Sequence, residues 1–175
     1  MSRYDQYDAL IFDLDGTLLD SMPGHYAAWQ KTAADFGFEV SESWYHTRGG
    51  SPTILTATTL VEQLHLDIEP SVLAAHKMQC FAEVMEAHLE MLPFTEVARR
   101  YAGKKPMAVG TGTLTDIATR MLKKAELLHL FDVVVGADQV SAHKPSPDTF
   151  LRCAELLSVT PSKCLVFEDA VFGFD

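Results

Sequence analysis

The stretch ALIFDLDGT, residues 9–17, carries the strongest structural signal in the sequence. Its first four residues are all apolar, which is typical of a short strand buried on both faces. Asp13 and Asp15 follow directly, and Gly16 permits the sharp turn that would let the two carboxylates approach each other. A calcium loop does not fit, because counting from Asp13 puts glycine at positions four and twelve. If this motif is considered alone, a solvated turn after a strand explains it equally simply.

Three further apolar runs predict strands, at residues 107–109, 133–135 and 164–167. Segments with helical spacing of apolar residues lie between them. The clearest is 114–125, and another is 150–157, which follows a plausible N-cap and first-turn proline at Ser146-Pro147. Alternating strands and helices predict an α/β fold with a Rossmann-like parallel sheet, and such sheets place their site at the carboxyl ends of the strands.

About 90 residues separate the first two strands, far more than one crossover helix needs. Residues 22–92 have an almost entirely helical pattern, with candidate helices at 24–36, 52–66 and 70–91. We therefore expect a discontinuous α/β core, residues 1–20 and 93–175, interrupted by a helical cap domain at 21–92. Only six residues follow Glu168-Asp169, so we also expect that the C-terminal part of the core is missing.

The composition excludes several classes of partner. The chain has 14 Lys and Arg against 24 Asp and Glu, a formal net charge of −10, which disfavours nucleic acid. No apolar run approaches the length that spans a bilayer, and the polar N-terminus has no signal-peptide pattern. The three cysteines are widely spaced and odd in number, which favours a reduced, cytoplasmic protein.

Polar residues also follow the other predicted strands. Thr111 lies between glycines in VGTGT, Lys144 lies in HKPSPD, and Glu168-Asp169 ends the last strand. Each alone has a plain explanation: a common Gly/Thr loop, an exposed lysine and an exposed acidic pair. Parallel strands, however, deliver their ends to one edge, and four carboxylates there would repel one another without a cation. Oxygen ligands without Cys or His select Mg²⁺, so we expect Mg²⁺ held by Asp13, Asp15, Glu168 and Asp169.

The ordered set DLDGT, VGTGT, HKPSPD and FEDA resembles the four motifs of the haloacid dehalogenase-like superfamily. The helical insertion resembles the cap of its β-phosphoglucomutase-like branch. The segments RGGSP, PMAVGTG and HKPSPDTF are most similar to those of the fructose-1-phosphate and 6-phosphogluconate phosphatases of that branch. The resemblance covers essentially the whole chain.

This resemblance implies a role for each motif residue. Asp13 would be the nucleophile that forms an aspartyl-phosphate, and Asp15 the general acid and then the base. Asp13, the main-chain carbonyl of Asp15, and Asp169 would hold Mg²⁺, with Glu168 binding directly or through water. Thr111 and the N–H groups near Gly112 would grip the phosphoryl group, and Lys144 would screen its charge.

The resemblance also implies substrate-binding residues in the cap. His25 is similar to a cap-hinge histidine, although a surface position on a helix explains it equally well. Arg48 and Gly49 begin a loop that suits closure over a sugar phosphate.

The predicted function is a Mg²⁺-dependent phosphatase for a small, fructose 1-phosphate-like metabolite, acting as a monomer or weak homodimer. A phosphosugar mutase of the same branch and a non-catalytic, truncated binding protein remain as alternatives.

Overall fold

The computed structural model describes residues 3–47 and 53–169. The chain divides into two units. The core unit comprises residues 1–20 and 90–175, and the helical unit comprises residues 21–89. Each of the two units has its own buried apolar residues.

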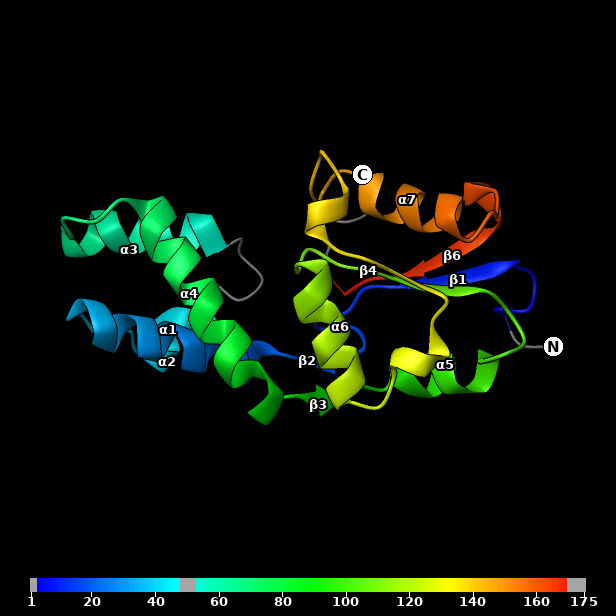
Figure 1. Cartoon of the computed structure of the whole chain (residues 1–175), viewed down its shortest axis with the longest axis horizontal. Coiled ribbons are helices and arrows are strands. Elements are labelled where there is room, and N and C mark those ends of the chain that lie inside the picture. The colour runs from blue at the N-terminus through cyan, green and yellow to red at the C-terminus, as the bar shows by residue number, and fades with distance from the viewer. Residues whose placement is uncertain (1–2, 48–52, 170–175) are drawn as a thin grey trace. The chain divides into compact units, whose positions relative to one another are not determined.

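A four-stranded parallel sheet forms the centre of the core unit (Figure 1). Its strand order is β5-β4-β1-β6, so the first strand along the chain lies in the middle. Phe12 at the end of β1 lies opposite both Val109 of β4 and Phe167 of β6, which aligns the carboxyl ends of the three strands. The strands are β1 Ala9–Phe12, β4 Met107–Gly110, β5 Val133–Val135 and β6 Cys164–Phe167.

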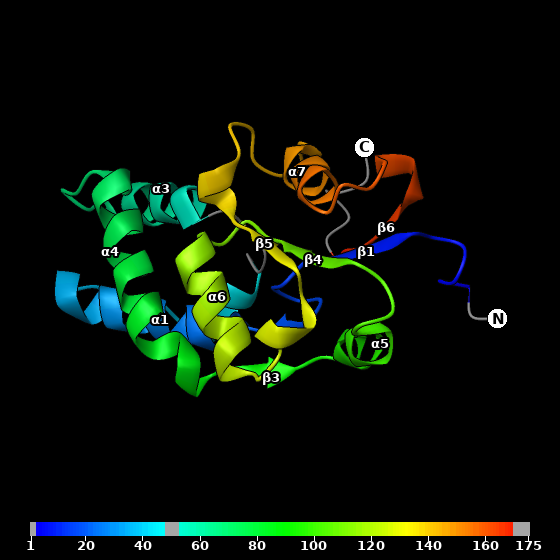
Figure 2. The same ribbon diagram turned by 45° about the vertical axis from the view of Figure 1, so that its right-hand side comes forward.

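Helices cover both faces of this sheet, which explains why β1 is apolar throughout (Figures 1 and 2). Helix α7, Asp148–Leu156, packs on one face, where Cys153 meets Ile11 and Ala108. Helices α5, Phe94–Tyr101, and α6, Thr115–Lys124, lie on the other face. The predicted α/β class with a parallel sheet is therefore confirmed.

A two-residue strand before the insertion pairs with a two-residue strand after it, and together they form a small antiparallel sheet. Strand β2, Leu19–Asp20, pairs with β3, Glu90–Met91. The predicted helix at 70–91 is therefore too long: α4, Pro70–Val84, ends earlier, and a 3₁₀ turn η1, Met85–Ala87, leads into β3. The pairing of β3 with β2 fixes an extended backbone there, which overrides the local helical pattern.

The helical unit contains four α-helices in its described residues, and α1 packs along α4 (Figure 1). Trp29, Ala33, Tyr45, Leu60 and Leu73 form its core. The short helix α2 was not predicted; the Ser41 hydroxyl caps it by accepting the backbone N–H of Trp44. The remaining helices are α1 Met22–Phe36, α2 Glu42–His46 and α3 Thr53–Leu64.

Smaller boundary differences occur in the core unit. Helix α7 begins at Asp148 with Pro147 as its N-cap, and Ser146 instead donates its hydroxyl to the Asp148 carboxylate at 2.9 Å. The core unit also contains three 3₁₀ turns in its described residues: η2 Leu128–Leu130, η3 Ala137–Gln139 and η4 Pro161–Lys163.

Among the described residues, no helix combines the length and hydropathy of a membrane span. All three cysteines are free thiols. The expectation of further core structure concerns the chain after β6, and residues 170–175 lie outside the described part.

Candidate active site

The loop after β1 gives Asp13 and Asp15 different partners. Asp13 extends the sheet, because its N–H donates to the Phe167 carbonyl at 2.9 Å. The backbone then turns through Gly16, whose φ is +88° and whose N–H donates to Leu19 at 2.8 Å. Asp13 faces Lys144, whereas Asp15 faces two threonines. The turn thus gives the two carboxylates different partners, as two different chemical roles would require.

Lys144 links the first and last strand ends. Its Nζ donates to Asp13 Oδ1 at 2.5 Å and to Glu168 Oε2 at 2.6 Å. Both carboxylates are nearly buried, with side-chain exposures of 6% and 3%. The lysine also lies against the ring of Phe150, 4.6 Å from its centroid. Lys144, for which an exposed surface position was the plain alternative, is therefore a fixed charge within the site, as predicted.

The electrostatics show a cluster short of positive charge. Burial raises the pKa of Asp13 to about 8, even though the Lys144 ammonium opposes that shift. Burial alone would lower the pKa of Lys144, but Asp13 and Glu168 outweigh it and raise the pKa. Neighbouring acids raise both pKa values, and at Asp13 they add to the larger effect of burial. We call Asp13, Asp15, Lys144, Glu168 and Asp169 the strand-end cluster, which sets one lysine against four acidic residues.

Three of these acids meet the requirements of a cation site. Asp13, Glu168 and Asp169 each offer a carboxylate oxygen, and these oxygens lie within 4.8 Å of one another. A β-carbon on Gly16 would stand 2.4 Å from Asp169 Oδ2, so the absence of a side chain there makes space for Asp169. Thr17 steadies the same carboxylate by donating to Oδ1 at 3.1 Å. This oxygen-only donor set fits Mg²⁺.

The loop after β4 holds Asp15 in place. Thr111 and Thr113 both donate their hydroxyls to Asp15 Oδ2, at 3.1 and 2.9 Å. Thr111 is itself fixed, since its N–H donates to Val135 at 3.0 Å and its hydroxyl accepts the Thr113 N–H at 3.0 Å. A β-carbon on Gly112 would meet no atom within 4 Å, so the backbone there is open to a ligand.

Of the three residues predicted to bind substrate from the cap, the structure describes His25 only. His25 lies in the first turn of α1 and is half-buried rather than exposed on the surface. Its ring stacks on Phe81 with centroids 3.9 Å apart, and its Nδ1 accepts from Lys77 Nζ at 2.6 Å. Burial and the Lys77 ammonium hold the pKa of His25 well below its ordinary value, so the ring is neutral at pH 7. Arg48 and Gly49 lie outside the described residues.

Sequence reasoning missed three contributors to these arrangements. Thr113 lies in the quoted VGTGT run, and its repeat of the Thr111 pattern could have signalled a second donor. Thr17 ends the DLDGT motif, where a hydroxyl after Gly suits the turn. Lys77 had no sequence signal, because its helix α4 has no clear apolar stripe; it is 1% exposed and lies 5.0 Å from the Phe81 ring centroid.

Comparison with known proteins identifies the family of the chain. A family model for haloacid dehalogenase-like hydrolases matches residues 7–174. The chain therefore belongs to the haloacid dehalogenase-like hydrolases, as the motifs indicated.

Its relatives narrow the class to phosphatases. Fructose-1-phosphate phosphatase YqaB of Escherichia coli is 42% identical, over 97% of this chain and 90% of YqaB. A phosphorylated carbohydrates phosphatase of Thermotoga maritima is 30% identical, over 96% of this chain and 79% of its own. A solved structure from Thermotoga maritima, named provisionally as a β-phosphoglucomutase, matches with a TM-score of 0.74. That structure is 29% identical and covers 95% of this chain, with 78% of its own chain matched.

Proposed function

We propose that this protein is a Mg²⁺-dependent phosphatase that hydrolyses small sugar phosphates of the fructose 1-phosphate type through an aspartyl-phosphate. The observation that carries the substrate class is the 42% identity to fructose-1-phosphate phosphatase YqaB across nearly the whole chain. The Thermotoga maritima phosphatase of phosphorylated carbohydrates supports the same class.

In the first half-reaction, the Asp13 carboxylate attacks phosphorus and the bond from phosphorus to the ester oxygen breaks. The sugar oxygen leaves with the proton of the Asp15 carboxyl group. The hydroxyls of Thr111 and Thr113 orient Asp15 for this transfer, since both donate to the same carboxylate oxygen. Lys144 touches Asp13 Oδ1, so it screens the approach of one anion to another.

In the second half-reaction, water attacks the phosphorus of the aspartyl-phosphate. The Asp15 carboxylate accepts a proton from that water, inorganic phosphate leaves, and the Asp13 carboxylate is restored. The open backbone at Gly112 would grip the phosphoryl oxygens in both steps, and the Thr111 hydroxyl would join it by turning from Asp15 Oδ2 to the phosphoryl group while Thr113 keeps Asp15 in place.

Magnesium would be held by Asp13, Glu168 and Asp169, with the main-chain carbonyl of Asp15. When bound, Mg²⁺ would supply positive charge that keeps Asp13 ionised against its raised pKa and stabilises the phosphoryl oxygens in the transition state. The short supply of cations in the strand-end cluster supports this assignment.

We assign substrate selection to the helical unit, as a cap. The sequence predicts residues 21–92 as this cap and residues 1–20 with 93–175 as the core, and the structure ends the helical unit at residue 89. His25, Arg48 and Gly49 would contact the sugar, and the buried Lys77 would hold the His25 ring in place through its ammonium. The free cysteines favour a reducing, cytoplasmic setting.

The test is phosphate release from a panel of phosphorylated sugars, with Mg²⁺ and with a chelator. We expect fructose 1-phosphate to be hydrolysed without any bisphosphate primer, and the rate to return to background in the chelator. Equal rates on all phosphate esters would contradict the substrate class, and undiminished hydrolysis in chelator would contradict the metal.

A phosphosugar mutase is the second candidate, because the Thermotoga maritima structure named as a β-phosphoglucomutase shares the fold at 29% identity. The same panel separates the two functions. Conversion of β-glucose 1-phosphate to the 6-phosphate, without release of inorganic phosphate, would establish the mutase and overturn the phosphatase.

A further inference from the structure

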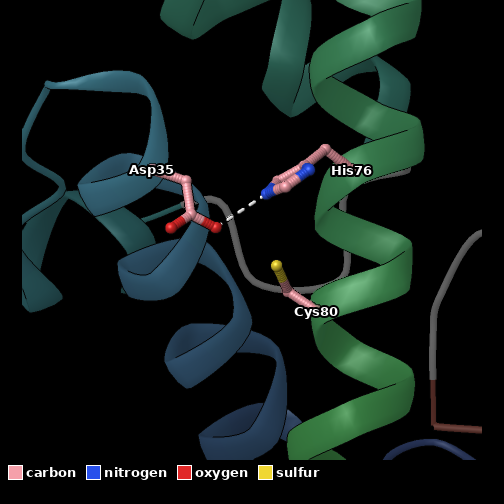
Figure 3. A group of neighbouring side chains, drawn as sticks. All are labelled: Asp35, His76 and Cys80. Carbon is pink, nitrogen blue, oxygen red and sulfur yellow. Dashed lines mark hydrogen bonds and ion pairs between the residues drawn. The ribbon is translucent and has the colours of Figure 1, made fainter.

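A second group of potential metal ligands lies within the helical unit, apart from the strand-end cluster. Asp35 on α1 faces His76 and Cys80 on α4 (Figure 3). We call these three residues the helix-pair cluster. The His76 Nε2 and Asp35 Oδ2 atoms are 2.8 Å apart, and one ligand atom from each of the three residues lies within 4.8 Å of the others.

Local structure holds these side chains on one face. His76 and Cys80 are four residues apart on α4, so they project from successive turns on the same side. The ring of Phe36 packs edge-on against the His76 ring, with centroids 5.0 Å apart and planes at 90°. That contact supports the orientation in which Nε2 points at Asp35.

The three side chains of the cluster differ in their exposure to solvent. Cys80 is 2% exposed, so its sulfur lies at the base between the two helices. The side chains of His76 and Asp35 are 32% and 42% exposed, so an ion can reach them from solvent. An ion would therefore meet His76 and Asp35 first and the Cys80 sulfur beneath them.

We propose that Asp35, His76 and Cys80 bind a zinc ion, with water as the fourth ligand. A thiolate, an imidazole and a carboxylate form a donor set that Zn²⁺ prefers and Mg²⁺ does not. Tetrahedral zinc sets such ligand atoms about 3.3–3.6 Å apart. In the cluster the His76 Nε2 and Asp35 Oδ2 atoms are closer than this, at 2.8 Å, and all three ligand atoms lie within 4.8 Å of one another. Rotamer adjustments of His76 and Asp35 would therefore be needed to complete the site.

Two groups compete with zinc for this site. Lys31 Nζ lies 3.5 Å from Asp35 Oδ2 and 3.7 Å from Glu83 Oε2. Both ion pairs are exposed, so the lysine can swing into solvent at little cost. The second competitor is the proton of the Cys80 thiol, which is released to solvent as the sulfur binds the metal. Removal of Lys31 should therefore strengthen zinc binding.

Bound zinc would join α1 to α4 through three protein ligands. Because the unfolded chain does not present these ligands together, binding favours the folded helical unit. This role is independent of the phosphatase chemistry, since the strand-end cluster offers oxygen ligands only.

Cobalt(II) is the probe for this test, because it adopts the geometry of zinc and absorbs light when a thiolate binds it. The metal-free full chain is titrated with Co²⁺. We expect a thiolate-to-cobalt charge-transfer band that saturates at one equivalent and disappears when Zn²⁺ is added. Cobalt bound to the strand-end cluster would give no such band, so the two sites are distinguished in one spectrum. The absence of the band in the wild-type chain would overturn the proposal.

Variants assign the ligands. Cys80→Ser and His76→Gln should abolish the band or weaken cobalt binding at least about tenfold. The matched controls are Cys164→Ser, whose thiol only donates to the Thr160 carbonyl, and His46→Gln, which is exposed near Glu42. Both controls should keep the band, and Lys31→Met should tighten binding. A band that survives Cys80→Ser, or that is lost in Cys164→Ser, would contradict the assignment.

Discussion

Lys144 lies between two nearly buried carboxylates, whereas Lys31 lies on the surface beside two exposed ones. The acids that contact Lys144 have side-chain exposures of 6% and 3%, and those that contact Lys31 have exposures of 42% and 64%. Water screens the exposed pairs, so they contribute little. In the strand-end cluster each charge depends on the others, because removing one partner leaves a buried charge uncompensated. The same substitution should therefore have unequal effects in the two clusters.

The largest difference is expected for Asp→Asn. Asp13→Asn should lower kcat/KM for fructose 1-phosphate at least about 1,000-fold, because an amide cannot attack phosphorus. Asp35→Asn changes an exposed residue of the helical unit and should leave kcat/KM within about twofold. Steady-state phosphate release measures both, with circular dichroism to confirm folding. Comparable losses in the two variants would break the distinction between the clusters.

Replacing each lysine with methionine should give the next largest contrast. Lys144→Met removes the cation at Asp13 Oδ1 and Glu168 Oε2, and we expect kcat to fall about 100-fold. Lys31→Met removes only exposed pairs and should leave kcat unchanged. If Lys144→Met retains most of the wild-type kcat, the lysine does not screen the nucleophile.

Alanine substitutions at two glycines with positive φ distinguish the effect of backbone strain from the effect of damage to the proposed metal site. Gly16 and Gly37 have φ values of +88° and +77°, so either change to alanine should lower the free energy of unfolding by about 1–2 kcal/mol. A β-carbon on Gly16 also meets Asp169 at 2.4 Å, whereas one on Gly37 meets no atom within 4 Å. Only Gly16→Ala should raise the Mg²⁺ concentration needed for half-maximal activity. Urea unfolding and a Mg²⁺ activation curve measure the two effects, and an unchanged curve for Gly16→Ala would argue against Asp169 as a ligand.

The smallest contrast concerns threonine hydroxyls. Thr113→Val removes one of the two hydroxyls that orient Asp15 Oδ2, so kcat should fall about tenfold. Thr32→Val removes a buried hydroxyl that donates only to the Ala28 carbonyl of its own helix, and kcat should not change. Stopped assays at saturating substrate give both values. An equal kcat in the two variants would mean that Thr111 alone positions Asp15.

The sequence predicted the parts of this protein whose signal is local. Four apolar runs gave the strands, because a strand covered by helices on both faces must be apolar throughout. Polar residues that follow those runs predicted Asp13, Thr111, Lys144 and Glu168 at one edge, because parallel strands share that edge. The structure places Lys144 against Asp13 and Glu168, and Thr111 against Asp15.

The features that depend on distant contacts were not predictable. Strand β3 forms because Glu90 and Met91 meet Asp20 and Leu19, about 70 residues earlier in the chain. Lys77 is buried by the rings of Phe81 and Trp29, and its own helix gave no sign of that environment. The pairing of Asp35 with His76 likewise depends on how α1 packs along α4.

The most direct test of the account is whether Asp13 carries the phosphoryl group. In the Asp15→Asn variant, an aryl phosphate can still react because its leaving group needs no proton, but water lacks its base. With Mg²⁺ present, intact-protein mass spectrometry should show the addition of one phosphoryl group that peptide mapping places on Asp13. The double variant with Asp13→Asn should show none. Hydrolysis that continues at the wild-type rate while Asp13 stays unmodified would contradict the proposed mechanism.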